Sequence, residues 1–406
     1  MVIAGGVNPY DATSVTSDSR WVVIVAEIFE HQLSPSSWNR FEECPRKYWL
    51  SRQRLPRKAS MPASLGNVIH NSMEEICNLD FEDREDSEVG WLSKLMKETI
   101  DKHWLMEKEI FLNTPRRPSW KPQSIGKARE GLVGALNLLF SKTKYAGKKF
   151  SEISIKDWKE IKSIVLSNEE SLISNDGRLI GRLDLLIDDL DEDGNSKGWI
   201  VADLKTGKPP NSTLNEKVTR QLLFYRDLLK ETKPNHPHVS AEGWYSSNQK
   251  IYSTDGDFVL DDAILAWNEM KLTTKPPEST PSEDACGFCE FKAWCPDWWI
   301  SRDQGKLSDK NTFRDEVVKI VKFDDFSGAA RFERQSPVGS EGKLVSSEIS
   351  FGALIKGRAL IQLKDIISSD YDGPVFLGSV RSQGQIIHLG DWSEVLPWSP
   401  LLKSIR

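Results

Sequence analysis

The spacing of apolar residues changes along the chain, from a helical period in the first part to a strand period further on. Between residues 34 and 160, apolar side chains recur every three or four positions. This pattern predicts amphipathic helices over 34–52 and 64–79, and a mainly helical stretch over 80–160. Ser34 precedes the first helix and is a typical N-cap residue.

Shorter apolar runs bounded by turn residues begin at residue 169 and predict strands. Residues 169–190 are expected to form two strands joined by an Asn-Asp-Gly turn, and residues 198–207 a third. The remaining predicted elements are helices over 218–231 and 261–272, short strands within 238–254, and a linker over 275–284. The sequence therefore predicts a mixed α/β domain after the first helices.

The last hundred residues differ again, because six short apolar segments are punctuated by turn residues. All six are expected to be strands, including residues 359–366 (ALIQLKDI). We therefore expect a separate small β domain over 301–406, with a five-stranded barrel of the OB type as one candidate. Residues 1–33 form an N-terminal segment, in which the apolar run 21–29 is either a strand or a helical turn.

Composition narrows the class of protein. The chain has 406 residues, of which 38% are hydrophobic and 28% charged, which suits a globular protein with two domains. No apolar run approaches the roughly 20 residues that span a bilayer. The N-terminus lacks a basic segment followed by a long apolar stretch. We expect a cytoplasmic or nucleoid-associated protein with no membrane partner, in which cysteines stay reduced.

A net charge of −6 argues against a passive nucleic-acid coat protein, but local basic segments still permit contact with DNA. One basic segment covers residues 40–58, and a second, proline-rich one covers residues 113–124. The second contains four candidates for strand contact, namely Arg116, Arg117, Trp120 and Lys121. A solvated helix face followed by a loop is the alternative interpretation of the first segment, and a surface loop with one anchoring Trp is the favoured interpretation of the second.

Four of the five cysteines have the spacing of a metal site. Cys286, Cys289 and Cys295 form a C-x2-C-x5-C motif, and Cys44 lies about 240 residues upstream. Four thiolates hold an iron–sulfur cluster or a zinc ion, and spacing alone does not separate the two. Unligated core cysteines are the third alternative. The fifth, Cys77, is expected to be buried in the core.

Polar residues interrupt two of the predicted strands. Asp184 lies among leucines, and Asp203 and Lys205 alternate with apolar residues. Residues two apart on a strand face the same side, so Asp203 and Lys205 should point together, and Asp184 joins them if the strands are neighbours. Two carboxylates and a lysine suit phosphodiester hydrolysis with Mg²⁺ or Mn²⁺. A buried Asp–Lys ion pair is the structural alternative.

Several short motifs occur together in a characteristic order. They are Gly66-x3-His70, Gly181-x2-Asp184, Asp203-Leu204-Lys205-Thr206-Gly207 and Gln221-x3-Tyr225. With the four cysteines, they resemble the RecB-like branch of the PD-(D/E)xK nucleases, and in particular its iron–sulfur members of the AddB-like and CRISPR-associated kinds. The resemblance covers residues 34–300. One departure is Leu183, which stands where the superfamily has a proline.

The resemblance implies a role for each motif. The divalent metal would be held by His70, Asp184, Asp203 and the backbone carbonyl of Leu204. Lys205 would be the catalytic lysine, and Gln221 and Tyr225 would line the site beside the bound strand. Cys44, Cys286, Cys289 and Cys295 would hold a [4Fe–4S] cluster. Glu169 or Glu170 is a further candidate at the edge of the site.

The resemblance also implies a restriction-endonuclease-like α/β core, in which helices flank a mixed central sheet and a helical insertion interrupts it. The leading hypothesis is a DNA nuclease, an exonuclease on single strands or ends, in repair, recombination or defence. The alternatives are a non-catalytic DNA-binding subunit and a zinc-bound structural protein. Because no phosphate-binding loop of the G-x4-G-K-[ST] type is present, a helicase would have to act in trans.

Overall fold

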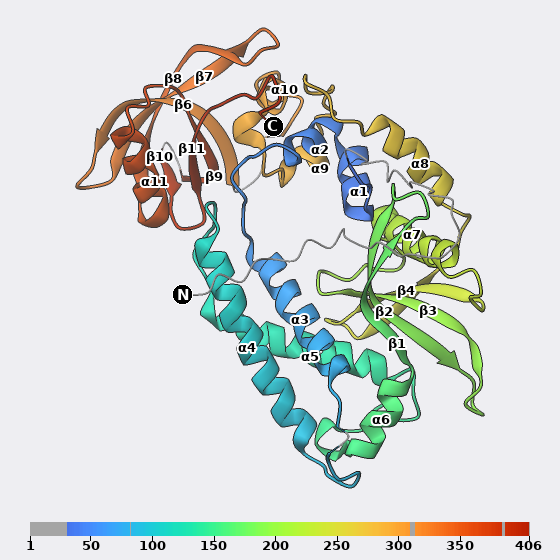
Figure 1. Cartoon of the computed structure of the whole chain (residues 1–406). Coiled ribbons are helices and arrows are strands. Elements are labelled where there is room, and N and C mark those ends of the chain that lie inside the picture. Colours follow the sequence, from blue (N-terminus) through green and yellow to red (C-terminus); the bar gives the residue numbers. More distant parts are fainter. Residues whose placement is uncertain (1–30, 82, 309–312, 384–385, 406) are drawn as a thin grey trace, which may run out of the picture.

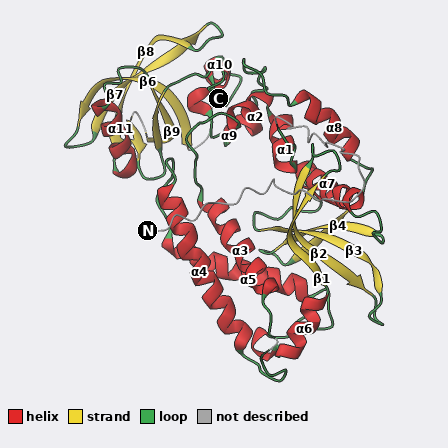
Figure 2. Cartoon of the chain, in the orientation of Figure 1, coloured by secondary structure: helices red, strands yellow, loops and turns green. Residues whose placement is uncertain are grey.

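The computed structural model describes residues 31–81, 83–308, 313–383 and 386–405 (Figure 1). The predicted apolar element at 21–29 lies outside these residues. The chain forms a five-stranded sheet flanked by helices and, apart from it, a C-terminal β domain (Figure 2). Mixed α/β architecture and a C-terminal β domain are thus both confirmed. Among the described residues, no helix combines the length and apolar character needed to cross a membrane.

The predicted helix at 34–52 is in fact two helices, α1 (Pro35–Glu43) and α2 (Pro45–Ser51). The Ser34 side chain caps α1 by accepting a hydrogen bond from the Ser37 amide. Cys44 separates the helices in an extended conformation, because the residue before a proline disfavours helical geometry. Pro45 then starts α2, where its missing N–H costs nothing. The break places the first cysteine between two helices.

The helices that follow build one side of the mixed α/β region. They are α3 (Met61–Asn78), α4 (Trp91–Asn113), α5 (Ile125–Phe140) and α6 (Ile155–Ser163), with 3₁₀ turns at Pro122–Ser124 and Phe150–Glu152. Their apolar faces share one core cluster with Leu185, Ile200 and Leu204 of the central sheet. These helices therefore cover one face of the sheet.

The central sheet has the order β1-β2-β3-β4-β5. Its strands are β1 (Val165–Ile173), β2 (Ile180–Leu190), β3 (Ser196–Lys205), β4 (Val239–Tyr245) and β5 (Lys250–Thr254). All neighbouring pairs are antiparallel except β3–β4, which are parallel and are connected through α7 (Glu216–Thr232). Together with α1 and α8 (Leu260–Glu269), α7 covers the second face.

The segment after the linker contains α9 (Glu283–Gly287), a 3₁₀ turn at Lys292–Trp294 and α10 (Pro296–Asp303). It carries three cysteines and packs against α2. Its aromatic residues share a core cluster with residues of the C-terminal domain, Val317, Phe376 and Trp398 among them. The cysteine segment therefore lies between the two domains.

The C-terminal domain is a ring of strands. Its elements are β6 (Phe313–Asp324), β7 (Ala329–Val338), β8 (Lys343–Ile355), α11 (Gly357–Ser368), β9 (Val375–Gln383), β10 (Ile386–Leu389) and β11 (Glu394–Pro397). Pairing runs β6-β7-β8-β10-β9 and returns from β9 to β6, with β8–β10 parallel and the other pairs antiparallel. Strand β11 adds to β9.

One predicted strand of this domain is wrong. Residues 359–366 belong to helix α11, because the buried side chains Ala359, Leu363 and Ile366 recur at helical spacing on one face. A two-residue alternation over the same stretch would have placed Ile366 on the face opposite Ala359 and Leu363.

Candidate active site

Side chains from α3, β1 and β2 converge at one end of the central sheet. His70 Nδ1 lies 3.4 Å from Asp184 Oδ1 and 3.8 Å from Glu169 Oε1. One ligand atom from each of these residues lies within 4.8 Å of the other two, the single such trio of metal-ligating side chains among the described residues. We call His70, Glu169 and Asp184 the metal trio.

Glu169 reaches the trio through an unusual backbone. Its φ of 49° lies in the left-handed region, which costs a residue other than glycine about 1–3 kcal/mol. On β1, Asn168 pairs with Leu185 and Glu170 pairs with Leu183. Glu169 therefore lies across from Asp184. Leu183 and Leu185 pack on opposite faces of the sheet although they are two residues apart, so regular alternation breaks here. Glu170 points elsewhere and pairs with Lys233.

A second group of polar side chains adjoins the metal trio. Lys205 Nζ lies 2.6 Å from Asp203 Oδ2 and donates to Gln221 Oε1 at 2.8 Å. Gln221 Nε2 donates to Asp203 Oδ1 at 2.9 Å and to the Tyr225 hydroxyl at 3.2 Å. The structure thus brings Asp203, Lys205, Gln221 and Tyr225 into one network.

The backbone of β3 connects this network to the trio. The Leu204 amide, between Asp203 and Lys205, donates to Asp184 Oδ2 at 2.7 Å. All six polar side chains predicted for the site therefore lie in two adjoining groups, together with the backbone of Leu204. Glu169, which was only an edge candidate in the sequence, lies with His70 and Asp184 in the trio, and Asp203 lies in the adjoining network.

Two glycines make the close packing around the site possible. A Cβ on Gly66 of α3 would lie 3.2 Å from Thr206 Oγ1, immediately after Lys205. A Cβ on Gly181 of β2 would lie 3.0 Å from the Tyr225 ring. Both distances are tighter than ordinary carbon contacts, so glycine lets α3 and α7 approach the strand ends.

Burial and like charges shape the protonation of the site. Asp203 is 3% exposed, and burial together with the Asp184 charge raises its pKa to about 6, against the opposing effects of Lys205 and His70. Burial works against a charged His70, but Asp184 and Glu169 outweigh it and raise the pKa of His70 to about 10. Burial also raises the pKa of Tyr225 well above its usual range. Arg182 Nε lies 2.6 Å from Glu169 Oε2, so three cations face the three carboxylates, and the mutual crowding of Asp184 and Asp203 is what favours a bound positive ion.

The donor chemistry suits a hard divalent cation. Two carboxylates and an imidazole nitrogen are ligands that Mg²⁺ and Mn²⁺ accept, and all three side chains are only partly buried. Such an ion would also relieve the repulsion between the neighbouring carboxylates of Asp184 and Asp203.

The four predicted cysteine ligands line one small pocket between α2 and the cysteine segment. Its other walls include Lys47, Leu50 and Trp298. Burial raises the pKa of Cys289 to about 11 and that of Cys295 further. Cys77 lies apart, buried in the core cluster of α3 to α6, as expected.

The two basic segments are less exposed than expected. Arg116 is 3% exposed and forms an ion pair with Glu394, and Trp120 packs on Trp104 and Phe111. Arg46 is likewise buried in an ion pair with Asp297. Trp120 is thus the anchoring residue of this loop, as the favoured interpretation expected, and Arg116 does not contact a strand as a candidate would, because Glu394 occupies it. Arg117 and Lys121 remain accessible.

Comparison of the sequence with known protein families identifies the superfamily to which the chain belongs. The sequence profile of the PD-(D/E)XK nuclease superfamily matches residues 32–296, well over half of the chain. No curated protein gives a significant match. The matched range begins just before α1, includes every residue of the metal trio and the lysine network, and ends just after Cys295. The chain belongs to the PD-(D/E)XK nuclease superfamily.

Proposed function

We propose that this protein is a Mg²⁺- or Mn²⁺-dependent deoxyribonuclease that acts on single strands or free ends. The observation that carries the proposal is the metal trio beside the Asp203–Lys205–Gln221 network. A cation site and a lysine amine at one sheet end are the two components that hydrolysis of a phosphodiester needs.

Different side chains would bind the metal ion, orient the attacking water and contact the strand. His70, Glu169 and Asp184 would hold the ion, with Asp203 and the Leu204 carbonyl completing its ligands. When bound, the ion polarises the scissile phosphate and lowers the pKa of a coordinated water. Lys205 Nζ, fixed by Asp203 and Gln221, orients the attacking water and stabilises negative charge on the phosphate oxygens. Gln221 and Tyr225, one helical turn apart, face the strand.

The four cysteines support assignment to the RecB-like, iron–sulfur branch of the superfamily. All four line one pocket between α2 and the cysteine segment. Together with the order of the nuclease motifs, this arrangement favours a [4Fe–4S] cluster over zinc, and the cluster would join α2 to the cysteine segment.

Metal analysis tests the cluster. Protein purified without oxygen should be brown and contain iron, and Cys289→Ala should lose the iron and melt at a lower temperature. Cys77→Ala is the matched control, because Cys77 is buried outside the pocket. Zinc in place of iron, or full iron content in Cys289→Ala, would refute this part of the proposal.

The C-terminal ring of strands supports a second domain assignment. Five strands that close through β8–β10 and β9–β6 pairing have the arrangement expected of an OB-type barrel. Such barrels commonly bind oligonucleotides, so we infer that this domain contributes to strand binding. A helicase or another repair or defence protein would act in trans.

One assay tests the enzymatic proposal. End-labelled single- and double-stranded DNA is incubated with the protein and Mg²⁺ or Mn²⁺, and the products are resolved by length. We expect metal-dependent cleavage by the wild type and none by Asp184→Asn. Wild-type protein that binds DNA but never cleaves it would instead support a non-catalytic DNA-binding subunit.

A further inference from the structure

A cavity of about 460 Å³ lies at the junction of the two domains. Its walls come from the start of α3, from the proline-rich loop after α4, and from the segment between β10 and β11 of the C-terminal domain. The residues that matter here are Lys58, Arg117, Lys121, Asp391, Trp392 and Glu394. Only part of this cavity lies within the nuclease region that matches the superfamily, so it depends on the C-terminal domain.

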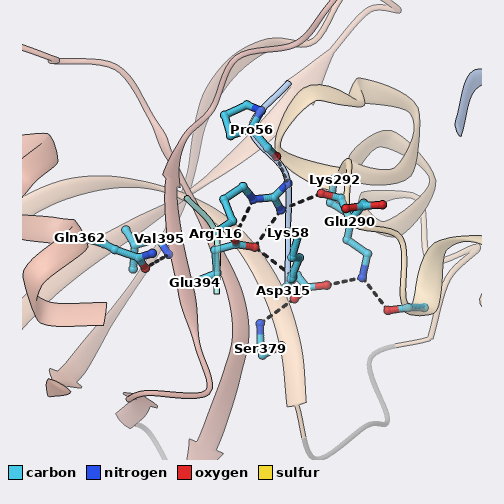
Figure 3. Close-up of polar contacts among 11 residues, drawn as sticks. Pro56, Lys58, Arg116, Glu290, Lys292, Asp315, Gln362, Ser379, Glu394 and Val395 are labelled. Carbon is cyan, nitrogen blue, oxygen red and sulfur yellow. Dashed lines mark hydrogen bonds and ion pairs between the residues drawn. The ribbon is translucent and has the colours of Figure 1, made fainter. Parts of the chain in front are cut away.

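A buried polar cluster holds the two walls together (Figure 3). Arg116 Nε donates to Glu394 Oε1 at 2.7 Å, and Arg116 also donates to the Glu290 carbonyl at 2.7 Å. Lys58 Nζ lies 3.0 Å from Glu394 Oε2, and Lys292 pairs with Asp315 of β6. The cavity therefore has walls that are fixed relative to each other.

The charges around the cavity leave a surplus of cations. Glu394 is already neutralised by Arg116, and Asp391 accepts a hydrogen bond from the Arg358 amide at the start of α11. No ion pair involving Arg117 or Lys121 occurs within the described residues.

A further cation, Arg358, reaches across the junction and donates to the Pro115 carbonyl. Burial and the nearby Arg117 lower the pKa of Arg358, so two guanidinium groups are held close enough to repel each other. Such a cluster favours an anion.

An exposed indole completes the cavity. The Trp392 side chain is 50% exposed although it lies in the turn before β11, beside Ser393 and Glu394, which are buried. An aromatic face next to cations is the combination that binds single-stranded nucleic acid, because bases stack on the ring while phosphates contact the charges.

Helix α3 connects this cavity to the metal trio. Met61, in the cavity wall, is nine residues before His70, which corresponds to about 14 Å along the helix axis. The cavity and the metal trio are therefore joined by about two and a half turns of one helix.

We propose that the junction cavity is a nucleotide-binding subsite for the substrate strand, with a base stacked on Trp392 and phosphates held by Arg117 and Lys121. This subsite rests on the proposed DNA nuclease function and adds to it a point of contact away from the scissile phosphate. Because both domains build the subsite, the C-terminal domain would take part directly in selecting single-stranded substrate.

Binding of fluorescein-labelled oligodeoxythymidylate, followed by fluorescence anisotropy in EDTA, tests the proposal without cleavage. Trp392→Ala should weaken binding about 5- to 150-fold, the loss expected for one stacked base, and Trp392→Phe should restore most of it. Phe258→Ala is the control, because Phe258 is 52% exposed on the nuclease region outside the cavity.

Salt dependence tests the phosphate contacts separately. Each lost contact to a single strand reduces the slope of log K against log salt by about 0.7, so Arg117→Ala with Lys121→Ala should reduce it by about 1.4. Lys94→Ala, on the exposed face of α4, should leave the slope unchanged. An unchanged affinity of Trp392→Ala together with an unchanged slope would overturn the subsite.

The two proposals fail in different ways. If wild-type protein cleaves DNA but substitution of Trp392, Arg117 and Lys121 leaves the affinity for the oligonucleotide unchanged, the subsite is overturned and the nuclease function stands. If affinity depends on these residues but no metal supports cleavage, the subsite stands and the nuclease function is overturned.

Discussion

Two polar clusters in this molecule differ in how their carboxylates are paired. At the junction of the domains, Glu394 and Asp315 have direct arginine or lysine partners, namely Arg116, Lys58 and Lys292. At the end of the central sheet, the carboxylates of Glu169, Asp184 and Asp203 lie close together, with His70, Arg182 and Lys205 around them. The sheet-end carboxylates therefore act on one another as well as on their cations, whereas the pKa of Glu394 at the junction is set by burial and by its cationic partners.

The pKa values follow the same division. Burial alone would raise the pKa of both Glu394 and Asp203. At the junction, Arg116 and Lys58 outweigh burial and lower the pKa of Glu394. At the sheet end, the charge of Asp184 adds to burial and the pKa of Asp203 rises to about 6. A carboxylate whose cationic partners lower its pKa stabilises the fold, whereas crowded carboxylates that raise each other's pKa are suited to binding a cation.

The largest expected effect is on catalysis. Lys205→Ala should lower the rate of DNA cleavage by about 10²- to 10⁴-fold, because it removes the amine that orients water and balances charge. Lys197→Ala, at the opposite end of β3 and 54% exposed, is the matched control and should keep wild-type activity. Equal cleavage rates for Lys205→Ala and wild type would remove Lys205 from the mechanism.

The next effect is on stability. Arg116→Ala leaves the buried Glu394 carboxylate without its main partner and should lower the free energy of unfolding by about 3–5 kcal/mol. Urea denaturation measures the change, with the exposed Arg54→Ala as control. A loss below about 1 kcal/mol would mean that the junction cluster does not hold the domains together.

Acid should weaken the junction as well. The lowered pKa of Glu394 means that its ionised form adds stability above its ordinary pKa of 4.5, and that this contribution disappears as the pH falls through the lower, folded-state value. Glu394→Gln should therefore be less stable than wild type at pH 7, with the difference shrinking below pH 4.5. A difference that stays constant with pH would contradict this assignment.

The smallest expected effect distinguishes the clusters most cleanly. Asp184→Asn relieves the repulsion on Asp203 but weakens the contact with His70, so in metal-free buffer at pH 7 these effects oppose each other and the free energy of unfolding should change by about 1 kcal/mol or less. Thermal melting in EDTA measures it. Destabilisation as large as that of Arg116→Ala would show that the sheet-end carboxylates are structural.

Much of the site followed from local geometry in the sequence. Two-residue alternation placed Asp203 beside Lys205, the hairpin brought Asp184 next to them, and helical spacing placed Gln221 above Tyr225. Each inference needed only one strand, one turn or one helix.

Other features depended on contacts that no local pattern reveals. Arg116 is in a loop that resembles a phosphate-binding segment, but its partner Glu394 is 278 residues away. Glu169 reaches the trio through a left-handed backbone in mid-strand, which an ordinary alternation pattern does not indicate. Helix α11 was mistaken for a strand because a short apolar run fits both periods, and only its packing against the barrel separates them.

The central claim is that His70, Glu169 and Asp184 hold the catalytic cation. Titration of the protein with Mn²⁺, with free Mn²⁺ followed by electron paramagnetic resonance, measures this directly. Wild-type protein should take up Mn²⁺, and both Asp184→Asn and Glu169→Gln should bind it at least about tenfold more weakly, since each loses a charged ligand. Uptake with the same affinity by wild type and both variants would contradict the account.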